Sequence, residues 1–170
     1  MTAFGTGLRL VIGADDAGLG LKAALIDYLH ELGLEVEDVG VRSPDEAAAA
    51  GIDYPDVAAT LAHGIASGRW TRGILVCGTG IGMAIAANKV PGVRAAQAHD
   101  TYSAERARKS NDAQVVTLGA RVIGVELAKS VVAAFLASDF AGGASTRKVD
   151  KLKALDRTLE AGPAPSTSRD

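Results

Sequence analysis

The sequence predicts an α/β protein in which a parallel sheet of about five strands is covered on both faces by helices. Short apolar runs alternate along the chain with longer segments in which apolar residues recur at helical spacing. Apolar strands that alternate with helices are typical of a parallel sheet buried on both faces. The length of 170 residues fits one domain, which we expect to span residues 1–160.

Local signals place the individual elements. We expect strands at five apolar runs, residues 8–12, 34–39, 73–77, 93–98 and 115–118. We expect helices at six segments, residues 21–32, 53–67, 83–89, 103–109, 124–138 and 146–159. Gly33 is typical of the residue that ends a helix, and Pro55 of a first helical turn. The segment between the second strand and the second helix is expected to be a loop that contains Pro44.

The two ends of the chain differ in character. The polar, glycine-bracketed segment 13–18 is expected to form a turn directly after the first strand. The last expected helix is highly charged and carries Val149, Leu152 and Leu155 on one side, so we expect it to pack on a second subunit. Residues 161–170 have too little to bury and are expected to be disordered.

Composition excludes several classes of function. The net charge is −2 and aromatic residues make up 4%, which argues against nucleic acid as a partner. No apolar run reaches the roughly 18 residues that a membrane span needs, and we expect no membrane partner. A single cysteine cannot form an internal disulfide, which favours the cytoplasm.

The most informative segment is the strand end at Cys77 with the loop that follows it. Three glycines, Gly78, Gly80 and Gly82, alternate with Thr79 and Ile81 before the next helix. Glycines let backbone N–H groups approach an anion closely, and a helix start adds positive potential. A thiol in such a field can serve as a base near neutral pH, although cysteine at a strand end is also a common core residue.

Two aspartates follow the first strand and favour the same edge of the sheet. Ligands of parallel sheets bind beyond the carboxyl ends of the strands, so Asp15, Asp16 and Cys77 are expected to share one cleft. Adjacent side chains in an extended turn point apart, so one carboxylate could contact substrate hydroxyls while the other orients the backbone. Aspartate is also simply a common turn residue.

A dinucleotide site is a weaker interpretation of the glycine loop. Asp100 lies about 20 residues further on, as an acid that binds ribose would. The fingerprint requires a third glycine at the position of Met83, however, and the first strand offers no better match. We therefore expect no cofactor.

The histidines and late basic residues are less specific. His30 and His63 lie in expected helices, and only His99, at a strand end, could approach the cleft. No cluster has metal-ligand spacing, so we expect no metal. Arg147 and Lys148 lie near an expected helix start, where an anion would be favoured, whereas later lysines are typical of a solvated face.

Several segments together resemble one known family. They are IGAD at residues 12–15, DYPD at 53–56, CGTGIG at 77–82, AANKVPG at 86–92, ND at 111–112, GARV at 119–122 and GG at 142–143. The chain is similar over about residues 8–150 to ribose-5-phosphate isomerase B and the related galactose-6-phosphate isomerase subunits. The resemblance implies a Rossmann-like sandwich that forms homodimers or homotetramers, with each active site at a subunit interface.

The resemblance also implies roles for individual residues. Aldose–ketose isomerisation passes through an enediolate and needs a base near the C–H bond and donors for the oxyanion. Cys77 would be the base, and Thr79 with the backbone of residues 78–82 would hold the enediolate oxygens. Asp15 and Asn111 would bind hydroxyls, and Arg121 would lie in the substrate pocket or near its phosphate.

The departures from the family pattern bear on the substrate. Asp16 and Ser110 stand where the family usually has histidines, and the second of these histidines is credited with opening the sugar ring. Ala144 and Ser145 replace an Arg-His pair, and Lys148 replaces a phosphate-binding arginine that Arg147 adjoins. His99 falls about 11 residues too early to be the missing histidine.

These departures leave the substrate open at this point. Ribose 5-phosphate is the default of the family. A tetrose 4-phosphate has its O4 esterified and cannot close a furanose ring, so a site without the ring-opening histidine suits erythrulose 4-phosphate and erythrose 4-phosphate. An unphosphorylated sugar is a further alternative, and so is a sugar-phosphate-binding protein without activity.

Overall fold

The computed structural model describes residues 7–161 and, within them, side chains up to residue 156. A five-stranded, entirely parallel sheet forms its centre, with the strand order β2-β1-β3-β5-β4. The strands are β1 Leu10–Ala14, β2 Val36–Asp38, β3 Arg72–Cys77, β4 Ala95–Gln97 and β5 Val115–Gly119. The predicted parallel sheet of about five strands is therefore confirmed.

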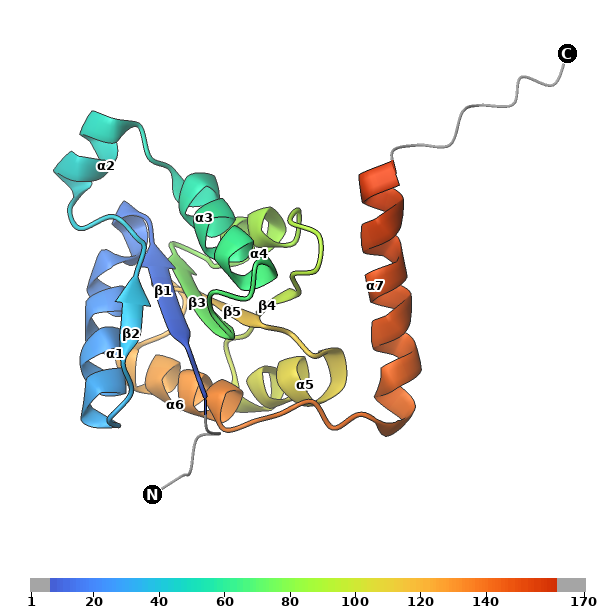
Figure 1. Ribbon diagram of the computed structural model, residues 1–170. Coiled ribbons are helices and arrows are strands. Elements are labelled where there is room, and N and C mark those ends of the chain that lie inside the picture. Colours follow the sequence, from blue (N-terminus) through green and yellow to red (C-terminus); the bar gives the residue numbers. More distant parts are fainter. Residues whose placement is uncertain (1–6, 162–170) are drawn as a thin grey trace, which may run out of the picture.

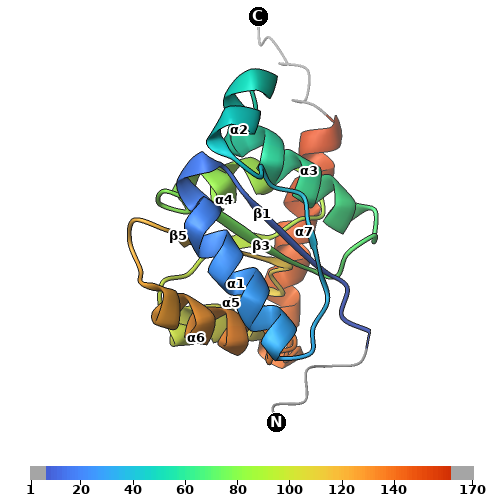
Figure 2. The same ribbon diagram turned by 90° about the vertical axis from the view of Figure 1, so that its left-hand side faces the viewer.

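Helices cover both faces of the sheet, which gives three layers (Figure 1). The helices are α1 Leu19–Glu31, α2 Pro44–Ala50, α3 Tyr54–Ala66, α4 Ile81–Ala87, α5 Thr101–Asn111, α6 Val125–Leu136 and α7 Thr146–Ala161. Two short 3-10 turns, η1 Asp16–Gly18 and η2 Gly143–Ser145, precede α1 and α7. Helices α1, α5 and α6 cover one face of the sheet; in Figure 1 α5 and α6 lie below the sheet and α1 stands at the left beside β2, and Figure 2 shows α1 and α6 side by side.

The core is divided by the sheet into two apolar clusters. Side chains of successive strand residues point to opposite faces, so Ile74 and Val76 pack toward α1 and α6, whereas Leu75 and Cys77 pack toward α3 and α4. Each of these four residues is buried. Cys77 thus lies at the carboxyl end of a central strand with the α3 and α4 layer above it.

Helix α2 corrects the expectation of a loop around Pro44. Ser43 caps this helix, because its hydroxyl accepts a hydrogen bond from the N–H of Glu46 at 3.1 Å, and Pro44 occupies the first turn. Ala47 is buried against the α3 side of the core, and Gly51 ends the helix with φ of 62°. A short alanine-rich helix has no apolar stripe that periodicity could reveal, although its cap signals were present.

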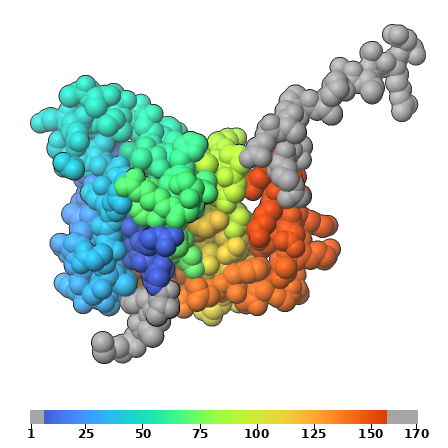
Figure 3. Space-filling model, viewed as in Figure 1, coloured from blue at the N-terminus to red at the C-terminus, as the bar shows by residue number. Residues whose placement is uncertain are grey.

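Helix α7 confirms the last expected helix and stands beside the rest of the fold (Figures 1 and 3). Val149 is buried, whereas Leu152 and Leu155 are exposed, and Asp156 accepts a hydrogen bond from the N–H of Gly92 at 3.1 Å. Packing on a second subunit stays a prediction. The disorder expected for 161–170 falls outside the described residues except at residue 161, the last residue of α7. No helix in residues 7–161 has the length and apolar character to span a membrane.

Candidate active site

The carboxyl ends of β1 and β3 bring Asp15 and Cys77 to one cleft. Ala14, the last residue of β1, pairs with Val76, so Asp15 leaves the sheet beside Cys77. The cleft has a volume of about 600 Å³. It is lined by Asp15, Asp16, Ala17, Tyr54, Cys77, Gly78, Thr79, Ile81, Gly82, Ile85 and Arg121. The shared cleft predicted for the two aspartates and the cysteine is therefore present.

The glycine loop turns back over the Cys77 sulfur. The N–H of Gly80 donates a hydrogen bond to Sγ of Cys77 at 3.1 Å, and Gly80 has φ of 78°, which only glycine adopts readily. A Cβ atom at this position would stand 2.9 Å from the carbonyl carbon of Leu118. The buried hydroxyl of Thr117 donates to the Gly80 carbonyl at 2.8 Å. The loop is thus fixed so that sulfur accepts a hydrogen bond, which is the role that a thiolate plays.

The end of β5, the end of β4 and the residues directly after β4 hold the outer side of the loop. The side-chain amide of Gln97 donates to the Thr79 carbonyl at 2.6 Å. Gly119 packs so closely that an added Cβ would lie 2.7 Å from the carbonyl carbon of Thr79. The N–H of Gly119 donates to Nε2 of His99 at 2.9 Å, so this nitrogen is an acceptor in the fold. His99 therefore supports the loop from behind and does not line the cleft.

Two side chains pack on the remaining loop glycines. The Tyr54 ring covers Gly82, where an added Cβ would lie 2.5 Å from Cε2 of the tyrosine. The Arg121 side chain covers Gly78 at 3.6 Å from such a Cβ. The N–H of Arg121 donates to the Gly78 carbonyl at 3.0 Å, which fixes its backbone beside the loop. The glycines therefore admit a ring and a guanidinium group to the walls of the cleft.

The aspartates differ in their surroundings. The Asp15 carboxylate accepts a hydrogen bond from the N–H of Gly18 at 3.1 Å and caps η1, whereas Asp16 is exposed. Burial raises the pKa of Asp15 above its ordinary value, and the neighbouring charge of Asp16 adds to this, while the bond from Gly18 and the charge of Arg121 oppose it. Among residues 7–156, neither aspartate nor Arg121 forms an ion pair, so these side chains are available to a ligand.

Besides Gly80, whose N–H is committed to the Cys77 sulfur, three predicted site residues lie outside this cleft within one chain. Asn111 ends α5, which begins beyond the carboxyl end of β4 and returns to the amino end of β5, so it lies at the opposite edge of the sheet. Arg147 and Lys148 start α7 near the same edge, where the N–H of Ala141 donates to the carbonyl of Lys109. The three roles stay predictions, and they require a second copy of the chain if the residues are to meet Cys77.

Other groups were not identified from the sequence. Tyr54, Ala17 and Ile85 line the cleft, although none of them was named as a site residue. Gly82 carried the signal for Tyr54, because a glycine in a first helical turn can admit a ring from a neighbouring helix. Asp100 caps α5 by accepting the N–H of Ser103 at 2.7 Å and has no part in the glycine loop. Within residues 7–161, no cluster of three or more His, Cys, Asp or Glu residues is arranged to hold a metal ion.

Fold and site together define a class: an α/β protein with a cleft for a small polar ligand beyond the carboxyl ends of a parallel sheet, in which a thiol lines the cleft. The sequence matches the model of the Ribose/Galactose Isomerase family over residues 10–152. The chain belongs to this family and is an isomerase, as the resemblance implied.

The chain aligns with named relatives over most of its length. The chain is 57% identical over 145 residues to a D-erythrulose-4-phosphate isomerase of Pectobacterium atrosepticum, an alignment that covers 85% of this chain and 93% of the relative. It is 48% identical to "Ribose-5-P isomerase B" of Listeria innocua, over 88% of this chain and 98% of the relative. The solved structure of ribose-5-phosphate isomerase B from Clostridium thermocellum is similar, with a TM-score of 0.83, 39% identity, and coverage of 88% of this chain and 98% of that one.

Proposed function

We propose that the chain interconverts an aldose phosphate and a ketose phosphate through an enediolate, with Cys77 as the base. The observation that carries this proposal is the Cys77 sulfur, which lines the cleft beside Asp15 and accepts the Gly80 N–H at 3.1 Å. A base for this reaction must reach a C–H bond next to a carbonyl while donors meet the oxygen that becomes charged. The thiolate and the loop provide both functions in one place.

The proposed steps move one proton between carbons and one between oxygens. Sulfur removes the proton from C2 of the aldose, and the electrons form the C1–C2 double bond of the enediolate while O1 becomes negative. The thiol then returns the proton to C1, O2 becomes the carbonyl oxygen, and the proton of O2 moves to O1. Thr79 fits the transfer at oxygen, because its Oγ1 accepts the Ile81 N–H at 3.3 Å and its own proton is left for the substrate.

The loop backbone supplies the donors for the negative charge. Gly80 is held by Leu118 and Thr117, so the N–H groups of Gly78 and Gly82 keep their places during the reaction. Helix α4 has only seven residues, so its dipole adds little and the local N–H groups carry the effect. Asp15 would bind a substrate hydroxyl and Arg121 an oxyanion or the phosphate.

We infer that the substrate is a tetrose 4-phosphate, the pair D-erythrulose 4-phosphate and D-erythrose 4-phosphate. No histidine lines the cleft in the described residues, and His99 uses Nε2 to accept the Gly119 N–H. Ser110 replaces the ring-opening histidine, and its hydroxyl accepts a bond from Nε of Arg106 at 3.1 Å. A substrate that cannot close a furanose ring needs no group to open one. The 57% identical relative carries the name of this activity.

Ribose 5-phosphate is the second candidate. The relative that is 48% identical over 98% of its length is named for that substrate, and the cleft of about 600 Å³ accommodates a pentose phosphate. With this substrate, opening of the ring would fall to Asp16, whose carboxylate stands at the position of the other family histidine. The two candidates differ in substrate length and share the chemistry at Cys77.

We further propose that the protein forms a homodimer, or a homotetramer that contains such dimers, in which each active site is completed by residues of both chains. The rim of the cleft exposes Tyr54, Ile81 and Ile85, with 41%, 51% and 58% of their surfaces accessible, and α7 exposes two leucines. Such apolar surface is typical of a subunit interface. A second copy would bring Asn111 and the basic start of α7 to this rim, with Arg147 and Lys148 near the phosphate. A reduced thiol also favours the cytoplasm.

A side-by-side assay tests the substrate. We would measure kcat/KM for D-erythrose 4-phosphate and ribose 5-phosphate with the same purified protein, following formation of the ketose. The proposal predicts a preference of at least about tenfold for the tetrose phosphate. A preference for ribose 5-phosphate would instead assign the pentose reaction and make Ser110 and Asp16 tolerated variations. Turnover of neither would refute the isomerase proposal for these substrates.

A further inference from the structure

The residue that follows Asn111 has an unusual backbone. Asp112 has φ of 50°, and it is the one non-glycine residue with positive φ in the part of the chain that the structure describes. The turn lets the N–H of Ala113 reach the carbonyl of Ala107 at 2.9 Å and ends α5. After α2 the equivalent left-handed position is a glycine, Gly51. An aspartate in this conformation is strained, so its carboxylate must provide something that glycine does not.

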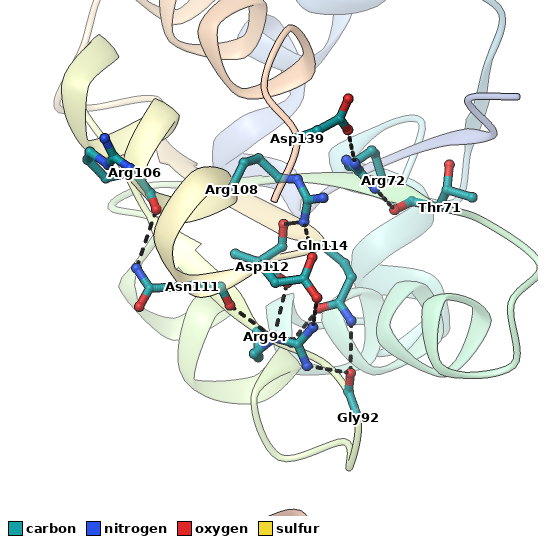
Figure 4. A network of polar contacts seen from close by, with 11 residues as sticks. Thr71, Arg72, Gly92, Arg94, Arg106, Arg108, Asn111, Asp112, Gln114 and Asp139 are labelled. Atoms are coloured by element: carbon teal, nitrogen blue, oxygen red, sulfur yellow. Dashed lines mark hydrogen bonds and ion pairs between the residues drawn. The ribbon is translucent and has the colours of Figure 1, made fainter. Parts of the chain in front are cut away.

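The carboxylate is held from two sides by guanidinium groups, of the buried Arg108 and the partly buried Arg94 (Figure 4). Oδ2 of Asp112 accepts from Nη2 of Arg94 at 2.8 Å, and Oδ1 accepts from Nη1 of Arg108 at 3.0 Å. The arginine side chains are 13% and 5% exposed, and that of Asp112 is 25% exposed. Nη1 of Arg108 also donates to the carbonyl of Ala113 at 2.7 Å. We call Arg94, Arg108 and Asp112 the α5 clamp.

Arg94 reaches beyond Asp112 to Asn111 itself. Its Nε donates to the carbonyl of Asn111 at 3.1 Å and to that of Asp112 at 3.0 Å. The arginine is in turn fixed by Gln114, whose side-chain oxygen accepts the Arg94 N–H at 2.9 Å and whose amide donates to Gly92 at 2.9 Å. The guanidinium group therefore ties the last residue of α5 to the loop between α4 and β4.

The side chain of Asn111 is left available. It is exposed, and its amide nitrogen makes a single long contact of 3.4 Å to the carbonyl of Arg106. In Figure 4 it lies on the side of α5 away from Asp112 and Arg108. The backbone of Asn111 is thus held firmly while its amide faces solvent, an arrangement suited to a group that must meet a ligand in a set position.

We propose that Arg94 and Asp112 are positioning residues that fix Asn111 for binding a substrate hydroxyl in the cleft of a second copy of the chain. This proposal rests on the proposed function, because it takes Asn111 as a substrate-binding residue. The clamp touches no substrate. It acts by holding the last turn of α5 in one orientation, so that the Asn111 amide does not have to be ordered when substrate arrives.

Kinetics of three variants and a control test this role. Asn111→Ala removes the amide, Asp112→Gly removes the carboxylate but keeps the left-handed backbone, and Arg94→Lys keeps the charge but loses the Nε bonds. Arg69→Lys is the matched control. Arg69 lies just before β3, at the same edge of the sheet, where it forms an ion pair with Glu37, and its side chain is 60% exposed. We expect KM for the preferred sugar phosphate to rise about tenfold in the three variants, with kcat changed much less, and to stay unchanged in the control.

A double-mutant cycle separates positioning from a general loss of structure. Adding Arg94→Lys or Asp112→Gly to Asn111→Ala should raise KM no further, because nothing is left to position. Additive effects would overturn the proposal, as would a normal KM in Asp112→Gly and Arg94→Lys when Asn111→Ala raises it. Should Arg94→Lys fail to fold, Asp112→Gly carries the test, since glycine relieves the strained backbone.

The same measurements separate this proposal from the proposed function. A wild-type enzyme that turns over neither sugar phosphate would refute the proposed function and the clamp with it. An active wild type with an unaffected Asn111→Ala would remove Asn111 from substrate binding and overturn the clamp, while leaving the reaction at Cys77 intact.

Discussion

The carboxyl and amino edges of the sheet are held by different kinds of contact. At the carboxyl edge, backbone groups and glycines fix the loop around Cys77, and the polar side chains of the cleft form no ion pairs in the described residues. At the amino edge, ion pairs between side chains hold the structure, and Asp112 lies between the partly buried Arg94 and the buried Arg108. The side chains that line the cleft are thus left to the ligand, whereas those around Asp112 are paired with one another.

This difference has a physical reason. A charge committed to an ion pair must lose that partner before it can bind substrate, which weakens binding. Backbone N–H groups held by close packing cost no such exchange and do not reorganise during the reaction. The amino edge has no reaction to carry out within its own chain, so strong pairing there only adds rigidity.

Replacing the Cys77 thiol should have the largest effect on activity. Cys77→Ser keeps the shape of the loop but removes the base, and we expect kcat to fall about 10³-fold. Binding of a non-reacting analogue, such as the four-carbon sugar acid phosphate, should stay within about threefold in calorimetry. Retention of normal kcat would remove Cys77 from the role of base.

Crowding the loop should have the next largest effect. Gly80→Ala places a methyl group 2.9 Å from the carbonyl carbon of Leu118 at φ of 78°, and we expect a loss of about 3 kcal/mol in the free energy of unfolding together with most activity. Gly33→Ala is the control, since Gly33 has φ of 73° with nothing within 4 Å of an added Cβ. Urea unfolding should show a loss of about 1 kcal/mol there, with normal kcat. Equal losses would show that close packing at Gly80 is unimportant.

The ion pair between Lys22 and Asp38 lies at the carboxyl edge but outside the residues that line the cleft, so its loss should affect stability and not catalysis. Nζ of Lys22, which is 4% exposed, donates to Asp38 and to the carbonyl of Val41, both at 2.7 Å, and ties α1 to the segment after β2. Lys22→Met leaves a partly buried carboxylate without its partner, so urea unfolding should show a loss of about 2 kcal/mol. The folded variant should keep its kcat. A large fall in kcat with unchanged stability would place Lys22 in the reaction instead.

The smallest expected effect is on stability and comes from the unpaired carboxylate of Asp15. Because burial raises the pKa of Asp15 in the folded protein, ionisation opposes folding once the pH exceeds the ordinary value of 3.8. That penalty is fully present at neutral pH and disappears at a pH where both states are protonated. Asp15→Asn keeps an acceptor for Gly18 and should raise Tm by about 1 °C at pH 7, less toward pH 4, while lowering kcat/KM. A lower Tm at pH 7 would contradict this sign.

Much of the carboxyl edge could be predicted from the sequence. Apolar runs predict the five strands, and parallel strands bring their carboxyl ends to one edge, so Asp15 and Cys77 were expected at the same edge. The pairing of β1 with β3 makes them neighbours. The glycine spacing after Cys77 predicted a loop between strand and helix; the loop is present, with Gly80 at positive φ. These predictions succeed because they depend on chain direction and local backbone, which a sequence encodes directly.

The supporting contacts could not be predicted in this way. That Gln97 and Thr117 hold the loop, that Tyr54 covers Gly82, and that Arg94 reaches Asp112 across 18 residues depends on packing between distant segments. Helix α2 was not predicted because its alanines give no periodic pattern of apolar residues. The resemblance named Asn111 as a site residue, but only the direction of α5 reveals that it lies at the edge away from its own Cys77.

Subunit mixing tests most directly the claim that one site combines the two edges from two chains. Cys77→Ser and Asn111→Ala proteins would be unfolded together, refolded at equal concentration and assayed at substrate well below KM. Random pairing gives half heterodimers, each with one intact site, so we expect about one quarter of wild-type activity. If Asn111 instead served its own chain, no intact site would form, and the mixture would show only the average of the two variants, about one twentieth of wild type.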